Sequence, residues 1–224
     1  MHYATENPQE HRKHGLRFNP FKAIIAPRPI GWVATVSNAG IVNLAPYSFF
    51  NAVSDIPPIV MFSSASRKDS LRNVEQNGEF TCSIACESLV DQMNLSSAPV
   101  VSEVSEFKLA QLLTAPSLVV KPPRVAASPA AIECRLWKTL ELPGPSGDNA
   151  NIIVFGHVVA VYINEQFIKD GILDTAAMRP VARMGYMDYA VVTPATSFTL
   201  NRPMVDDSGR SATVQAGPWD GVYR

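Results

Sequence analysis

The stretch from Arg28 to Ser70 reads RPIGWVATVSNAGIVNLAPYSFFNAVSDIPPIVMFSSASRKDS. It holds three apolar, strand-like runs, which are separated by a turn, by a proline–aromatic–serine bend and by a serine-rich loop. Each run ends in small hydroxyl, amide or cationic side chains rather than in plain turn residues. This combination predicts a pocket that is built from β-strands and holds a flat, phosphorylated ligand.

The composition is that of an ordinary globular protein. The chain has 224 residues, which fits one large domain or one domain with an extension. Its formal net charge of −1 gives no electrostatic reason to expect nucleic acid or an anionic membrane as a partner. No apolar run approaches the ~18 residues of a membrane span, and the polar N-terminal sequence lacks the apolar core of a secretory signal. The three cysteines form no CxxC pair, so we expect reduced thiols and a cytoplasmic location.

The sequence divides into an arm (residues 1–20), a β-rich body (21–192) and an extended tail (193–224). Runs rich in β-branched and aromatic residues predict strands at Ile30–Ser37, Ile41–Leu44, Ile59–Phe62, Phe80–Ala85, Ala130–Trp137 and Ile152–Ile163. Gly40 suits a hairpin between the first two runs. Gly156, inside the longest run, predicts a bulge, a barrel corner or a close approach by a ligand or by backbone.

Helix signals are few and short. Ser66–Asp69 matches a capping box that opens a helix ending near Gly78, and Ser88–Asp91 matches a second one for a helix toward Leu95. Residues 103–113 are expected to form a surface helix. A doubly wound α/β sheet needs a crossover of about a dozen residues or more after each strand, usually a helix. We therefore predict a mainly β protein with an antiparallel barrel.

Familiar catalytic and nucleotide-binding signatures are absent from the sequence. It contains no GxGxxG after a strand, no GxxxxGK[ST] loop and no GxSxG elbow. It also lacks HExxH, and its four histidines (His2, His11, His14 and His157) have no ligand spacing. No metal site is therefore predicted.

The loop from Ser63 to Ser70 is suited to a phosphate group. Its serines supply hydroxyl donors and Arg67 and Lys68 supply positive charge. The predicted helix that follows adds free backbone N–H groups. The alternative explanation is an ordinary capped helix start with two solvated cations.

Two further elements fit a ligand pocket. In Asn43–Asn51, the proline lacks an N–H and is expected to end regular ladder bonding, while the three aromatic residues form an apolar wall. A bulged strand with core aromatics explains the same residues. Arg183–Tyr186, followed by Tyr189, fits either a ligand rim or a capped surface turn.

Together and in this order, these elements resemble the flavin reductase-like family of FMN-binding split barrels, which includes flavoredoxins and short-chain flavin reductases. The matching segments are Arg28–Thr35, Asn43–Asn51, Pro57-Pro58, Lys68–Ser70, Phe80, Gly156–Val158 and Pro180–Gly185. Ser70 stands where the family more often has threonine, which keeps the hydroxyl group. The acidic segment 103–113 lies outside the shared pattern. The resemblance implies an antiparallel split β-barrel of the Greek-key type with a few short peripheral helices.

The resemblance also implies an FMN site. The isoalloxazine ring is expected near Val33, Ala34, Thr35, Pro46, Tyr47, Ser48, Phe49, Phe50 and Asn51. The phosphate is expected near Ser63, Ser64, Arg67, Lys68 and Ser70. The family's site typically lies at a homodimer interface, so Arg183 is expected to reach the flavin of the partner subunit. His157, the one histidine on a strand expected to face inward, is explained either as a core residue or as a neighbour of the flavin or nicotinamide.

The implied function is hydride transfer from NAD(P)H to flavin N5, with electrons passed to an unidentified acceptor. An electron-acceptor protein is one candidate for that acceptor. No catalytic side chain is predicted, because the cofactor carries the chemistry. Three alternatives stay open: a flavoredoxin-like FMN electron carrier without direct NAD(P)H activity, a pyridoxamine-phosphate-oxidase-like enzyme, and a non-catalytic barrel that binds a flat ligand. The oxidase would need a second basic phosphate site, which the sequence does not offer.

Overall fold

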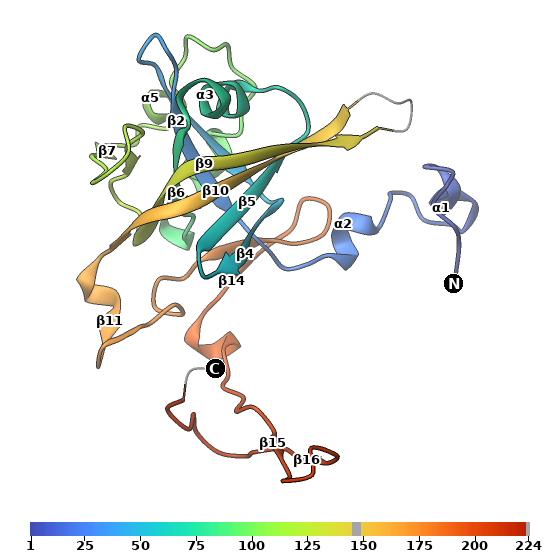
Figure 1. Cartoon of the computed structure of the whole chain (residues 1–224). Helices are drawn as coiled ribbons and strands as arrows, with labels where there is room; N and C mark the ends of the chain where they lie inside the picture. Colours follow the sequence, from blue (N-terminus) through green and yellow to red (C-terminus); the bar gives the residue numbers. More distant parts are fainter. Residues whose placement is uncertain (145–148, 223–224) are drawn as a thin grey trace.

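Seven antiparallel strands form the main sheet of the protein, in a computed structural model that describes residues 1–144 and 149–222 (Figure 1). In spatial order they are β3 (Val42–Tyr47), β2 (Gly31–Val36), β6 (Glu79–Ile84), β9 (Ala130–Pro143), β10 (Asn149–Ile163), β5 (Pro58–Ser64) and β4 (Phe50–Asp55). The two edge strands, β3 and β4, do not pair with each other. The sheet is therefore a barrel with an open side, and the predicted mainly β split barrel is confirmed.

The remaining elements are short. The helices are α1 (Glu10–Lys13), α2 (Phe21–Ile24), α3 (Asp69–Asn77), α4 (Val90–Leu95) and α5 (Glu106–Leu109), with 3-10 turns at Glu87–Leu89, Glu165–Phe167 and Pro194–Thr196. A second sheet has the order β1 (Arg28–Pro29), β13 (Val181–Arg183) and β14 (Tyr189–Val191). Two-strand pairs join β7 (Thr114–Ala115) to β8 (Arg124–Val125), β11 (Ile168–Lys169) to β12 (Ile172–Leu173), and β15 (Met204–Val205) to β16 (Ala212–Thr213).

The hairpin of β2 and β3 forms as predicted, with Gly40 at a φ of 78° in its turn. The expectation that Pro46 ends the ladder is wrong, because Pro46 lies inside β3 and is paired in register with Trp32. A proline is tolerated there because β3 is an edge strand, where a missing N–H need not break a ladder on both sides.

The predicted capping boxes do not form, although both helices exist. Helix α3 begins at Asp69, after Lys68, and no side chain caps its first turn. Its end at Gly78, which has a φ of 72°, matches the prediction. Before α4 the chain makes a 3-10 turn instead of a box at Ser88.

The buried apolar residues form two clusters. Trp32, Leu44, Met93 and Phe107 belong to one cluster. The other cluster contains Phe62, Leu71, Phe80, Val154 and their neighbours.

The prediction that residues 103–113 form a helix at the surface is wrong about the surface. Residues 106–109 of this segment form α5, and Phe107 of α5 is only 3% exposed because it packs into the first cluster.

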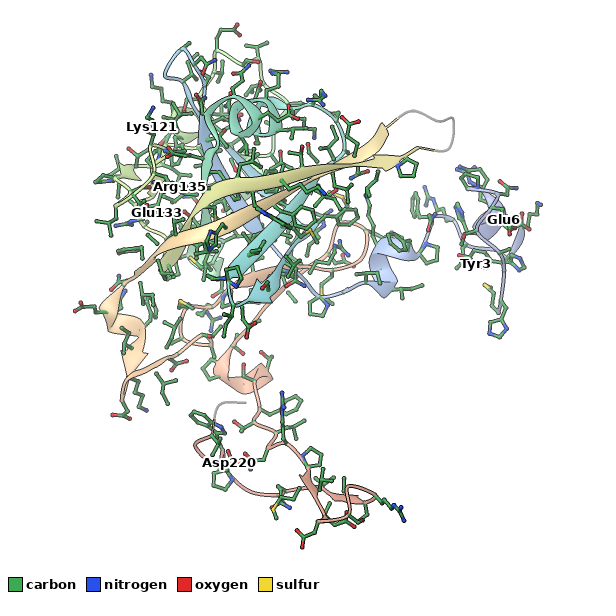
Figure 2. All side chains as sticks on the ribbon, viewed as in Figure 1. Tyr3, Glu6, Lys121, Glu133, Arg135 and Asp220 are labelled. Carbon is green, nitrogen blue, oxygen red and sulfur yellow. The ribbon has the colours of Figure 1, made fainter. Side chains whose placement is uncertain are left out.

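The arm and the tail lie at the periphery. In Figures 1 and 2 the segment that carries Tyr3 and Glu6 and the segment that carries Asp220 extend away from the seven-stranded sheet, whereas Glu133 and Arg135 lie on β9. The division at residues 20 and 192 stays a prediction. Within the described residues, no helix combines the length and the apolar character needed to cross a membrane.

Candidate flavin site

A cavity of about 650 Å³ opens beside the edge strand β3. Its lining residues come from seven places: α2, β3 and the bend after it, the end of β5, the start of α3, segment 96–102, α5 and β10. They are Lys22, Asn43, Ala45, Pro46, Tyr47, Ser48, Phe49, Ser63, Ala65, Lys68, Asp69, Ser70, Arg72, residues 96–102, Glu106 and Asn151. The fold thus brings two predicted elements, the Pro46 bend and the serine-rich loop, to one cavity.

The phosphate-suited part of this cavity contains Lys68 and two hydroxyl groups. Lys68 is exposed, and the structure records no carboxylate paired with it among the described residues. Ser63 accepts a hydrogen bond from Asn151 Nδ2 at 3.0 Å, so its own proton stays available. The buried Ser70 donates to Asn43 Oδ1 at 2.8 Å. Among the described residues, Lys68 is therefore a cavity cation without a carboxylate partner, whereas Lys22 lies over the Phe49 ring.

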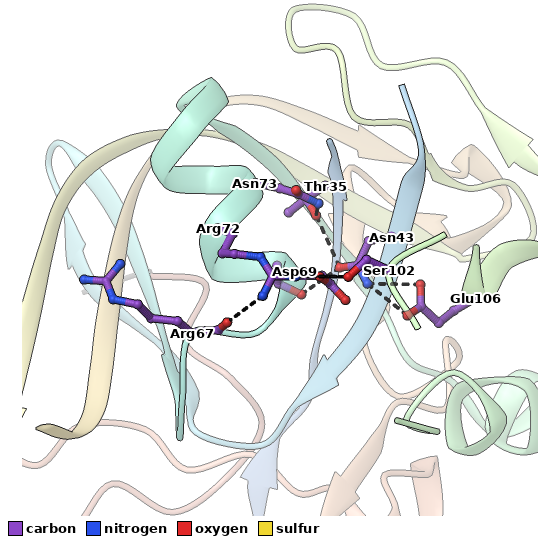
Figure 3. Close-up of polar contacts among 9 residues, drawn as sticks. Thr35, Asn43, Arg67, Asp69, Arg72, Asn73, Ser102 and Glu106 are labelled. Atoms are coloured by element: carbon purple, nitrogen blue, oxygen red, sulfur yellow. Dashed lines mark hydrogen bonds and ion pairs between the residues drawn. The ribbon is translucent and has the colours of Figure 1, made fainter. Parts of the chain in front are cut away.

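Two residues predicted for the phosphate do not line the cavity. Arg67 forms ion pairs with Glu75 and with Glu141, the latter at 2.9 Å, and Figure 3 shows its guanidinium directed away from the cluster of polar residues. Ser64 is buried, and its hydroxyl donates to the carbonyl of Ser66 at 2.7 Å. The sequence alone did not separate Arg67 from Lys68, because the two cations are adjacent in the chain.

The predicted ring-binding residues divide in the same way. Pro46, Tyr47, Ser48 and Phe49 line the cavity. The other predicted residues do not line it: Val33, Ala34 and Thr35 are fully buried in β2, Phe50 is half-buried in β4 and Asn51 is exposed. Phe50 packs on the backbone of β2, since a Cβ at Gly31 would lie 2.5 Å from its Cδ2 atom.

A buried network of polar side chains adjoins the cavity, and two of its members, Asn43 and Glu106, line the cavity itself (Figure 3). Asn43 Nδ2 donates to both carboxylate oxygens of Glu106 at 3.0 Å, and the Leu44 N–H donates to the same carboxylate at 2.9 Å. Thr35 donates to Asn43 Oδ1 at 3.3 Å and accepts from Asn73 Nδ2 at 3.0 Å. Burial raises the pKa of Glu106, while the hydrogen bonds from Leu44 and Asn43 oppose that rise. Glu106 was missed as a site residue because its segment was expected at the surface.

Segment 96–102 forms a wall that sequence reasoning did not identify. Ser102 Oγ donates to Asp69 Oδ1 at 2.8 Å and accepts from Arg72 Nη2 at 3.0 Å, while Arg72 also forms an ion pair with Asp69. At its other end, Ser96 Oγ accepts from Trp32 Nε1 at 2.9 Å. Helix α3 and strand β2 thus hold the two ends of the wall. The pairing also neutralises Arg72, another cation at the cavity.

His157 and Arg183 lie outside this cavity. The inward orientation expected for His157 is wrong, since its side chain is exposed on β10. The Arg183 guanidinium lies 4.4 Å from the ring centroid of Tyr189 and donates to the carbonyl of Tyr186 at 2.5 Å. In the part of the chain that the structure describes, no group of three or more histidine, cysteine or acidic side chains is placed to hold a metal ion.

A split barrel with a cation, hydroxyl groups and aromatic rings at its open side is a ligand-binding barrel. Its family is shown by comparison: the flavin reductase like domain matches residues 25–181, and the chain belongs to the flavin reductase-like family. The resemblance seen in the sequence is thereby confirmed, and the chain is a flavin-related oxidoreductase.

Three known proteins illustrate the similarity. An uncharacterized protein of Halalkalibacterium halodurans is 35% identical over 189 residues, which cover 82% of this chain and 90% of the relative. Nitrilotriacetate monooxygenase component B from Bacillus cereus has a TM-score of 0.80 and 29% identity, covering 89% of this chain and 98% of that one. The 2-nitrobenzoate 2-nitroreductase NbaA of Pseudomonas fluorescens has a TM-score of 0.77 and 25% identity, and the match covers 92% of this chain and 100% of that one.

Proposed function

We propose that the protein is an FMN-binding oxidoreductase that takes a hydride from NAD(P)H and passes the electrons to an acceptor. The observation that carries the proposal is the composition of one cavity, which joins the unpaired Lys68 and the start of α3 to the aromatic bend at Pro46–Phe49. A phosphate needs the first group of residues and a flat ring needs the second. Both are parts of FMN.

The residues present fit this cofactor. The cavity volume of about 650 Å³ falls within the range of roughly 300–1,000 Å³ that small-molecule sites occupy. Lys68 and Ser63 offer donors to a phosphate, and α3 directs free backbone N–H groups toward an anion. The buried hydroxyl of Tyr47 has no hydrogen-bond partner among the described residues, and a bound molecule would supply one.

Each part of the chain then has a defined task. Lys68 and Ser63 hold the phosphate, and residues 46–49 hold the ring. Backbone N–H groups within residues 48–51 stabilise negative charge at the edge of the ring. When bound, FMN supplies the redox chemistry, accepting a hydride at N5 and releasing electrons to the acceptor. No side chain is required as nucleophile or general base.

We also propose a cytoplasmic homodimer in which Arg183 reaches the flavin of the partner subunit. Large apolar side chains on helix α2 and on the tail favour association, since Ile24 is 72% exposed, Leu200 78% and Phe198 83%. Light scattering during gel filtration measures the assembly. A monomer at working concentration would contradict it.

The function is tested by an absorption spectrum of the purified protein, recorded before and after NADH or NADPH is added without oxygen. We expect a flavin band, present as purified or after adding FMN, that bleaches with one of the two nucleotides. A band that bleaches only with a chemical reductant would favour the electron carrier. A protein that neither contains nor binds flavin would refute the proposal.

A further inference from the structure

Two polar groups of the cavity have no role in holding a phosphate or a ring. They are the hydroxyl of Tyr47 on β3 and the carboxylate of Glu106 on α5, and both residues line the cavity. Their side chains are almost fully buried, at 8% and 6% exposure. Burial raises the pKa of Tyr47, and the negative charges of Asp69 and Glu106 add to that rise.

The Tyr47 hydroxyl is an unused hydrogen-bond donor. It is one of two buried side-chain atoms in the described residues without a partner, the other being Arg28 Nε. The hydroxyls of Ser64 and Ser70 lie near enough to lower the pKa of Tyr47, but they donate to the Ser66 carbonyl at 2.7 Å and to Asn43 Oδ1 at 2.8 Å, and neither is placed to hydrogen-bond the Tyr47 oxygen. An unsatisfied buried hydroxyl destabilises a fold, and such groups are rare unless a ligand or water completes them.

The Glu106 carboxylate is a partly used acceptor. Its oxygens accept from Asn43 Nδ2, shared at 3.0 Å, and from the Leu44 N–H at 2.9 Å. A carboxylate offers about four acceptor positions, so it can accept further hydrogen bonds. Within the described chain no lysine or arginine pairs with it. This part of the cavity is therefore anionic and repels a phosphate.

A hydroxyl group is the ligand chemistry that matches both residues. It accepts from the Tyr47 O–H and donates to the Glu106 carboxylate, and a chain of hydroxyls does both at once. A phosphate accepts from Tyr47 but is repelled by Glu106, and an ammonium group cannot accept from Tyr47. We infer that Glu106 and Tyr47 form a hydroxyl-binding subsite that takes the ribityl chain of the flavin. This inference rests on the proposed function.

Riboflavin and lumiflavin separate the subsite from the ring site, because they share the isoalloxazine ring and differ in the ribityl chain, which a methyl group replaces in lumiflavin. Their affinities are measured by quenching of flavin fluorescence in the wild type, Tyr47→Phe and Glu106→Gln, with Glu103→Gln as an exposed control on the same segment. We expect both subsite variants to weaken riboflavin about fivefold to tenfold and lumiflavin less than about twofold. The control should change neither.

Thermal unfolding without flavin shows whether a variant binds riboflavin less well only because its fold is less stable. Tyr47→Phe removes an unpaired group, so this variant should be at least as stable as the wild type while binding riboflavin less well. Equal losses for both flavins, or no loss for either, would overturn the subsite but leave the flavin function standing. A wild-type protein that binds neither of these flavins nor FMN would overturn both proposals.

Discussion

The side-chain amide of Asn43 lies 3.0 Å from each carboxylate oxygen of Glu106, although the two residues are separated by 63 positions in the chain. The same carboxylate accepts the Leu44 N–H at 2.9 Å. One acidic side chain therefore fixes α5 against the edge strand β3. It satisfies polar groups that β3 presents on its open side and makes α5 a part of the cavity wall.

Asn43→Asp should destabilise the protein. The change removes the donor that Glu106 uses and places two carboxylates against each other. Losing hydrogen bonds to a charged group costs about 1.5–3 kcal/mol, which lowers the melting temperature by roughly 4–10 °C in a chain of this size. Thermal unfolding at neutral pH measures the effect. Asn94→Asp, at an exposed position, is the matched control and should change little, and an equal drop in both variants would contradict the argument.

The pH dependence of stability should carry a contribution from Glu106. Burial raises its pKa above the ordinary value of 4.5, so the folded state binds this proton more tightly than the unfolded state does. The sign follows directly: the contribution to stability falls as pH rises from about 4.5 through the raised pKa, and is constant above it. The free energy of unfolding of the wild type minus that of Glu106→Gln should decline across this interval. Urea denaturation at a series of pH values tests it, and a rising difference would refute it.

Much of the fold follows from local sequence signals. The β2–β3 hairpin was predictable because Gly40 takes a positive φ between two β-branched runs. The end of α3 at Gly78 was predictable for the same conformational reason. These features depend on neighbouring residues only, so a single sequence contains them.

Features that depend on long-range packing were not predictable in the same way. Glu106 has the charge of a surface residue. It is buried because Phe107 beside it packs into the core and because its carboxylate accepts from Asn43 and Leu44. Segment 96–102 has no polar pattern of its own, and it reaches the cavity through bonds to Trp32 and Asp69. The apolar residue next to Glu106 was the one available signal that its helix is not fully exposed.

Lys68 and Arg67 should differ in their effect on flavin binding. Lys68 lines the cavity without a recorded carboxylate partner, whereas Arg67 is paired with Glu75 and directed away. Removing one charge-assisted hydrogen bond costs about 1.5–3 kcal/mol, so Lys68→Ala should weaken FMN roughly 10- to 100-fold. Riboflavin, which has no phosphate, should bind almost as before.

Arg67→Ala is the matched control for this measurement, because it removes the adjacent positive charge. It should change FMN affinity by less than about threefold, since an exposed charge directed away from the ligand is screened by salt. Titration calorimetry at two ionic strengths gives both affinities. If Arg67→Ala weakened FMN more than Lys68→Ala did, the assignment of the phosphate to Lys68 would be wrong.

Gly156→Ala should destabilise the barrel through one contact. The ladder between β9 and β10 shifts register between Phe155 and Gly156, and a Cβ at Gly156 would lie 2.2 Å from the Cζ atom of the fully buried Phe80. Overpacking of this kind costs about 1–3 kcal/mol, which lowers the melting temperature by roughly 2–10 °C. Phe80→Leu should also destabilise, since it leaves a void. The double variant should be more stable than the sum of the two losses predicts, because the smaller side chain makes room for the new methyl group. Thermal unfolding of all four proteins measures this coupling, and strictly additive losses would show that Phe80 is not the reason for glycine at this position.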